Sequence, residues 1–270
     1  MAGPAGEFEG QPGEGRPQRE VAQRVFAAEF NDAKHSYKES GDRSPTFVVS
    51  PYGAKVNRLF AVGVLTSVEG VGQTGDRYRA QVVDPTGTFT VYAGQYEPEA
   101  TAQLMDIRPP AVVAIVGKSR SYTTPEGATY VNVRPESIRT VEKADRDAWV
   151  LETARHSLQR LDAIREAAKL EAPTQKALED LGFPKDVAEG AMKAIEHYGK
   201  TDLPRYAAII RDALESLAPG AAEDAASRRG RGPGDPSSAA RQTAEPSFAP
   251  AAPSAPKPAA AGAKLGSAVC

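Results

Sequence analysis

Apolar and polar positions alternate with a period of two through much of residues 58–141, the pattern of strands buried on one face. The alternation is cleanest in two neighbouring segments, residues 77–83 and 88–93. In the first segment, one face carries Tyr78, Ala80 and Val82, and the other carries Arg77, Arg79 and Gln81. In the second, one face carries Phe89, Val91 and Ala93, and the other carries Thr88, Thr90 and Tyr92. Between them, Asp84–Gly87 places proline and glycine where tight turns favour them, so the pattern predicts a hairpin.

Three further strands and one helix are expected in the same region. Residues 58–68 form a long β-branched run with Gly63 inside it, where we expect close approach of another backbone. Residues 97–107 begin with proline and acids and then show helical spacing, so we expect a helix. The last two strands are expected at 111–120 and at 129–141. The order strand, strand, strand, helix, strand, strand predicts a five-stranded OB-fold (oligonucleotide/oligosaccharide-binding) barrel with the helix plugging it.

Helical patterns lie on both sides of this barrel. Residues 19–30 predict an amphipathic helix, which a polar connection follows. Residues 46–54 are expected to be extended, either leading into the first barrel strand or adding to its edge. After the barrel, helices are expected at residues 146–170, 174–181, 184–198 and 203–217.

These patterns predict an α+β protein: an OB-fold barrel followed by a C-terminal helical domain, with disordered termini. The expected parts are a disordered N-terminus (1–18), an amphipathic helix with linker (19–45), the barrel (46–143), the helical domain (144–218) and a disordered Ala/Pro-rich tail (219–270). The two ends are too poor in apolar residues to offset the entropy of ordering.

Composition argues against several classes of function. Cys270 is the single cysteine, so no internal disulfide or cysteine-based metal site is possible, and we expect a reducing cytoplasmic location. No segment has the length of apolar sequence that a membrane span needs, and no export signal is evident. The three histidines, His35, His156 and His197, lack the surrounding ligands of a metal or catalytic site. We therefore expect no enzyme activity, no cofactor and no metal.

Nucleic-acid binding is the chemistry that the barrel favours. Ligands of OB-fold barrels lie across the second and third strands, and there the outward phase offers Arg77, Arg79 and Tyr92. The loop expected after the fourth strand adds Lys118, Arg120 and Tyr122. Basic and aromatic residues that alternate suit a single strand, in which phosphates and exposed bases alternate. These six residues are the predicted nucleic-acid-binding set.

An alternative interpretation is that these charges form ordinary solubilising surface and that Tyr92 packs against the N-terminal helix or a partner. Four other aromatic residues are expected in the core from their phase. They are Phe60, Tyr78, Phe89 and Tyr130. The bases of the barrel lie on its predicted strands, whereas most of its acids lie in turns and in the helix, so a basic face is expected despite an overall net charge of -2.

Three runs of sequence, residues 19–31, 47–66 and 130–138, resemble archaeal replication protein A (RPA) family proteins, in particular their small RPA-associated OB-fold subunits. The resemblance extends over about residues 19–170. It implies a non-catalytic subunit of an archaeal complex that binds single-stranded DNA in DNA replication, recombination and repair, alongside a larger RPA subunit. No zinc-finger cysteines are present, so no metal role is implied, and the near-neutral composition argues for a non-halophilic source.

Two alternatives remain open. The chain could be a scaffold that assembles with the larger subunit without binding DNA itself. Less favoured is an OB module for RNA, which would prefer structured RNA over DNA.

Overall fold

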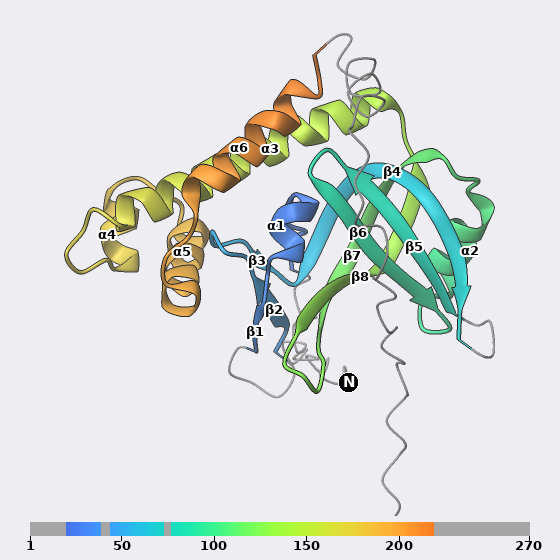
Figure 1. Ribbon diagram of the computed structural model, residues 1–270, viewed down its shortest axis with the longest axis horizontal. Helices are drawn as coiled ribbons and strands as arrows, with labels where there is room; N and C mark the ends of the chain where they lie inside the picture. Colours follow the sequence, from blue (N-terminus) through green and yellow to red (C-terminus); the bar gives the residue numbers. More distant parts are fainter. Residues whose placement is uncertain (1–19, 39–43, 73–76, 219–270) are drawn as a thin grey trace, which may run out of the picture. The chain divides into compact units, whose positions relative to one another are not determined.

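The computed structural model describes residues 20–38, 44–72 and 77–218. The segments expected to be disordered, 1–18 and 219–270, lie outside the described residues. Five strands form a closed barrel in the order β4-β5-β6-β8-β7 (Figure 1). Their bounds are β4 (Arg58–Val71), β5 (Arg77–Asp84), β6 (Gly87–Gly94), β7 (Ala111–Thr123) and β8 (Thr129–Thr140). The predicted α+β class and OB-fold barrel are confirmed.

All neighbouring barrel strands are antiparallel except β6 and β8, which are parallel and meet at Val91 and Val133. The phase predicted for the hairpin is confirmed, because the Ala80, Val82, Phe89 and Val91 side chains are buried. Gly63 is required by close approach, since a Cβ there would lie 2.5 Å from the Val83 carbonyl oxygen.

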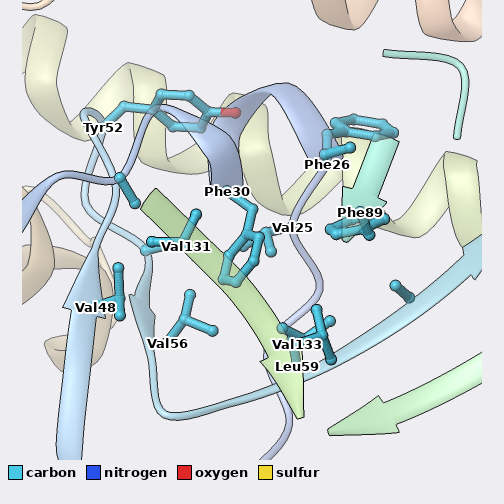
Figure 2. Close-up of a cluster of buried hydrophobic side chains, with 14 of the residues drawn as sticks. Val25, Phe26, Phe30, Val48, Tyr52, Val56, Leu59, Phe89, Val131 and Val133 are labelled. Carbon is cyan, nitrogen blue, oxygen red and sulfur yellow. The ribbon is translucent and has the colours of Figure 1, made fainter. Parts of the chain in front are cut away.

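Two short helices close the ends of the barrel (Figure 1). α2 (Pro98–Asp106) lies between β6 and β7 in the chain and buries Ala100 and Leu104. At the end formed by the β5–β6 turn lies α1 (Ala27–Asn31), preceded by the buried Phe26. The ring of Phe30 lies 5.9 Å from that of Phe89, which places it in the core cluster drawn in Figure 2. α1 is therefore part of the barrel's hydrophobic core.

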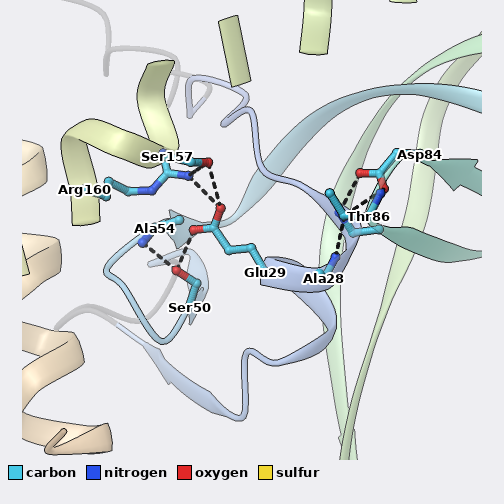
Figure 3. Close-up of polar contacts among 9 residues, drawn as sticks. Ala28, Glu29, Ser50, Ala54, Asp84, Thr86, Ser157 and Arg160 are labelled. Atoms are coloured by element: carbon cyan, nitrogen blue, oxygen red, sulfur yellow. Dashed lines mark hydrogen bonds and ion pairs between the residues drawn. The ribbon is translucent and has the colours of Figure 1, made fainter. Parts of the chain in front are cut away.

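The β5–β6 turn fixes the start of α1 through polar contacts (Figure 3). The Asp84 carboxylate accepts a hydrogen bond from the Ala27 N–H at 2.7 Å, and the Thr86 hydroxyl accepts one from the Ala28 N–H at 3.0 Å. Asp84 thus satisfies a helix-terminal donor that would otherwise be unpaired in a buried place.

The amphipathic helix expected over residues 19–30 is mostly wrong, because the described residues 20–26 are not helical. Gln23 forms a parallel bridge with Leu59 of β4. Its N–H donates to the Arg58 carbonyl at 2.8 Å, and its own carbonyl accepts from the Phe60 N–H at 2.9 Å. β5 pairs with β4 only from Val64 onwards, so the start of β4 has backbone groups on that side that Gln23 satisfies.

A second, three-stranded sheet follows α1. It consists of β1 (His35–Lys38), β2 (Thr46–Val49) and β3 (Lys55–Val56), all antiparallel. β1 lies where a polar connection was expected. β2 confirms the extended segment expected at the start of residues 46–54, but it belongs to this small sheet and does not add to the edge of the barrel.

Four helices follow the barrel, within a few residues of their predicted bounds. They are α3 (Lys143–Ala167), α4 (Gln175–Asp180), α5 (Lys185–Tyr198) and α6 (Leu203–Glu215). Small residues make their close packing possible, because Ala188, Ala191 and Ala213 are almost fully buried. α3 also packs on the barrel, where the Trp149 indole N–H donates to the Phe60 carbonyl at 2.9 Å. That the helices form a domain of their own, 144–218, stays a prediction. Over the described residues, no helix has the length and apolarity that crossing a membrane requires.

Candidate nucleic-acid interface

The first group of predicted site residues lies on the outer face of β5 and β6. Arg79 and Tyr92 are direct cross-strand partners, and the Arg77 guanidinium lies 5.3 Å from the centroid of the Tyr92 ring. Arg79 also pairs with Glu69 at 2.9 Å. The hydrogen bond that Arg79 donates to the Glu69 carboxylate raises the pKa of the Arg79 guanidinium, which therefore stays charged. The structure brings these three predicted residues together, with Tyr92 half-buried between two guanidinium groups.

The second group lies on β7, and here the sequence-based expectation of a loop is wrong. Lys118, Arg120 and Tyr122 are part of β7, which extends as one arm of a long hairpin with β8. The residues follow one another at a spacing of two, so all three belong to the same phase of the strand. Lys118 and Arg120 are exposed, and neither side chain forms an ion pair or hydrogen bond with any described residue. Both cations are therefore available to an anionic ligand.

The facing strand contributes residues that the sequence interpretation missed. Tyr130 pairs with Tyr122, Asn132 with Arg120, and Arg134 with Lys118. Tyr130 was expected in the core, but its side chain is 56% exposed. The reason is the phase of β8, because Val131 and Val133 are buried and the residues that alternate with them, Tyr130 and Asn132, must face outward.

The other three aromatic residues expected in the core have different environments. Phe89 is fully buried, as expected. Tyr78 and Phe60 are only partly buried against the core. The Phe60 ring lies on the outer side of the barrel, where the Arg24 guanidinium is 5.1 Å from its centroid.

Three cations form a row across adjacent strands, and we call Arg58, Lys118 and Arg134 the cation row. Lys118 of β7 is the cross-strand partner of Arg58 on β4 and of Arg134 on β8. Both arginines are already paired with carboxylates: the Arg58 Nε lies 2.8 Å from Glu136, and Arg134 forms an ion pair with Glu97. Like charges directly opposite on a sheet repel each other, so these glutamates stabilise the row.

The two groups meet where β6 and β8 run in parallel. Val91 and Val133 are paired and buried, so the residues that follow them, Tyr92 and Arg134, both belong to the outward phase. Arg134 also lies 5.7 Å from the centroid of the Tyr96 ring, and Tyr96 is 75% exposed. A basic and aromatic band thus continues from β5 through β6 and β8 to β7.

Two of the three histidines contact each other. The His35 and His197 rings stack with centroids 3.8 Å apart, and His156 lies on α3. Across the described ranges, no group of three or more His, Cys, Asp or Glu side chains is placed to hold a metal ion.

No protein-family model matches the sequence, and no curated protein does either. Among solved structures, the chain is similar to a replication protein A heterotrimer bound to ssDNA, with a TM-score of 0.36 and 16% identity over 52% of this chain and 98% of that chain. It is also similar to a small single-stranded DNA binding protein from Mycoplasma pneumoniae, with a TM-score of 0.26 and 14% identity over 33% of this chain and 96% of that chain. A mitochondrial single-stranded DNA binding protein from S. cerevisiae has a TM-score of 0.27 and 14% identity, covering 32% of this chain and 95% of that chain. The strand pairing described above, and not these likenesses, establishes the barrel.

Proposed function

We propose that the barrel binds single-stranded DNA along the outward band formed by β5, β6, β8 and β7. The observation that carries the proposal is the β7–β8 hairpin, where Lys118 and Arg120, which form no ion pair with a described residue, continue directly into the cross-strand pair of half-buried Tyr122 and exposed Tyr130. Cations bind phosphates, and tyrosine rings stack on bases that are not already stacked in a duplex. The band therefore favours single strands over double-stranded DNA.

We further propose the cellular setting that the sequence resemblance implies. The chain would be a non-catalytic subunit of an archaeal RPA-type complex in the cytoplasm, acting in DNA replication, recombination and repair. Its partner would be a larger RPA subunit. Binding of single-stranded DNA by the chain itself does not depend on that assignment.

The test is a titration of the full chain with fluorescein-labelled oligo-dT, followed by anisotropy over a range of salt concentrations. Each phosphate contact to a single strand contributes about 0.7 to the slope of log affinity against log salt. The double variant Lys118→Ala/Arg120→Ala should bind more weakly and lose about 1.4 from that slope. The control is Lys143→Ala/Lys169→Ala on and just after α3, which removes the same charge from exposed side chains away from the band.

A scaffold without DNA affinity is the second candidate. It is favoured by the carboxylates that already neutralise two cations of the band and one cation of the row beside it, because Arg79, Arg134 and Arg58 all have glutamate partners. In that case, the isolated chain would show no salt-dependent binding to oligo-dT but would co-purify with its larger partner. Adding structured RNA as a competitor in the same assay distinguishes an RNA-binding role from binding of single-stranded DNA.

A further inference from the structure

The two arginines at the ends of the cation row are neutralised by glutamates, whereas the lysine at its centre is not. Arg58 is held by Glu136, and Arg134 by Glu97, whereas Lys118 between them makes no ion pair with a described residue. We propose that Glu97 and Glu136 are competing anions that occupy phosphate positions in the free protein and set the affinity for single-stranded DNA. This inference rests on the proposed function and deepens it.

Glu136 reaches its arginine across the full width of a strand. It lies on β8, its partner Arg58 lies on β4, and β7 runs between them. The register between β7 and β8 shifts at Val116 and Gly117, which leaves Glu136 as the extra, unpaired residue of β8. A carboxylate that spans β7 to pair with Arg58 occupies a guanidinium that a DNA phosphate would otherwise bind.

Glu97 has the corresponding place at the other end of the row. It precedes α2 as its N-terminal cap residue, and its side chain is 12% exposed, whereas that of Arg134 is 37% exposed. The Arg134 guanidinium also lies against the ring of Tyr96. Displacing Glu97 would free this guanidinium for a phosphate while it still borders an exposed tyrosine on which a base can stack.

The expected change in DNA affinity follows from the small free energy that such ion pairs contribute. Partly exposed ion pairs are weak, and breaking one costs a factor of about two to five in an equilibrium constant. Each glutamate removed also takes away a negative charge that repels the DNA. We therefore expect Glu97→Gln and Glu136→Gln each to tighten binding to oligo-dT roughly two- to fivefold at low salt, with the gain shrinking at high salt.

The experiment compares the wild type, the two single variants and the double variant by anisotropy with labelled oligo-dT. The matched control is Glu189→Gln on α5, which removes the same charge and breaks an ion pair of the same kind, with Lys55 at 2.7 Å. A second variant tests the pairing itself, since Glu136→Gln should tighten binding less in an Arg58→Gln background than in the wild type, where it also frees the guanidinium. Thermal melts establish that each variant is folded.

The outcomes separate this inference from the function on which it rests. Tighter binding by Glu97→Gln and Glu136→Gln but not by Glu189→Gln supports it, and so does binding by the double variant when the wild type does not bind. Wild-type binding that these substitutions leave unchanged overturns the inference and leaves the function standing. If neither the wild type nor the double variant binds, both are refuted.

Discussion

A guanidinium nitrogen of Arg160, on α3, lies 2.7 Å from the carboxylate of Glu29, on α1, and the two side chains are 6% and 0% exposed. Glu29 also accepts a hydrogen bond from the Ser50 hydroxyl at 2.8 Å, and that hydroxyl accepts one from the Ala54 N–H (Figure 3). Three segments distant in sequence are thus joined through one buried carboxylate. This buried ion pair, with the hydrogen bonds that Glu29 also accepts, ties the helix after the barrel to the segment before it.

Replacing one member of this pair should destabilise the protein strongly. Glu29→Gln or Arg160→Met leaves a buried, uncompensated polar or charged group, and we expect a loss of about 3–5 kcal/mol in the free energy of unfolding. Urea unfolding followed by the fluorescence of Trp149, the single tryptophan, measures this loss. Glu152→Gln is the control, because it breaks an ion pair with Arg24 whose side chains are 35% and 52% exposed. Similar losses for Glu29→Gln and the control would show that burial of the pair is unimportant.

A contact between two glycines gives the second stability prediction. A Cβ on Gly190 of α5 would lie 2.0 Å from the Gly53 carbonyl oxygen, and Gly53 itself has a φ of +94°. Gly190→Ala should therefore cost about 1–3 kcal/mol of unfolding free energy, outweighing the helix propensity gained. Gly70→Ala is the matched control, since its Cβ would meet no atom within 4 Å. A Gly190→Ala protein as stable as the wild type would mean that α5 does not approach this loop so closely.

Acidification should weaken the packing of α5 against β1. Burial, and next the charge of His197, lower the pKa of His35 from 6.5, and Lys193 adds to this lowering while Glu196 opposes it. Because folding favours the neutral ring, its stability contribution is present above pH 6.5 and is lost as the pH falls through the lowered pKa.

The measurement is the melting temperature between pH 8 and pH 5 for the wild type and His35→Gln. The variant should lose less stability over this range. His156, whose pKa is lowered by burial and next by Arg160, should contribute in the same direction, and His156→Gln isolates that share. Identical pH profiles for the wild type and His35→Gln would contradict the assignment to His35.

The barrel could be predicted because its signals are local. Ala80 and Val82 alternate with Arg79 and Gln81 regardless of what lies around them, and Gly63 indicates a close backbone approach that the Val83 carbonyl supplies. The helices after the barrel could be predicted equally well, since Gly182 and Gly199 both adopt the positive φ typical of helix ends.

The N-terminal segment could not be predicted in the same way. Val25, Phe26 and Phe30 fit a helical period, and all three are buried, but what decides the structure is the unpaired start of β4 that captures Gln23. That partner lies more than thirty residues away in the sequence. The periodicity of apolar residues predicts which side chains are buried. It does not predict which backbone groups will form hydrogen bonds with the segment.

The candidate site was predicted in part for a similar reason. Arg79 and Tyr92 follow from the phase of one hairpin, whereas the cation row requires knowing that Lys118 pairs with both Arg58 and Arg134. The length of β7 was underestimated because Ser119 and Ser121 interrupt its apolar phase. The exposure of Tyr130 could nevertheless have been predicted, because the valines on either side of Asn132 determine which residues of β8 face the core.

Tyr130 gives the sharpest prediction about the interface. Its side chain is exposed, so Tyr130→Ala should leave the unfolding free energy almost unchanged. If a base stacks on its ring, the same change should weaken binding to oligo-dT by about 1–3 kcal/mol. The effect should be nearly independent of salt, unlike that of Lys118→Ala, because stacking releases no counterions.

Tyr130→Phe separates stacking from hydrogen bonding at the same position. Phenylalanine keeps the ring and removes the hydroxyl, so affinity close to that of the wild type is expected. Tyr96→Ala tests whether the band extends past Arg134, since this ring is exposed and borders that guanidinium. If Tyr130→Ala binds oligo-dT as tightly as the wild type while Tyr96→Ala does not, the DNA follows the β6–β8 seam and does not reach the far part of the β7–β8 hairpin.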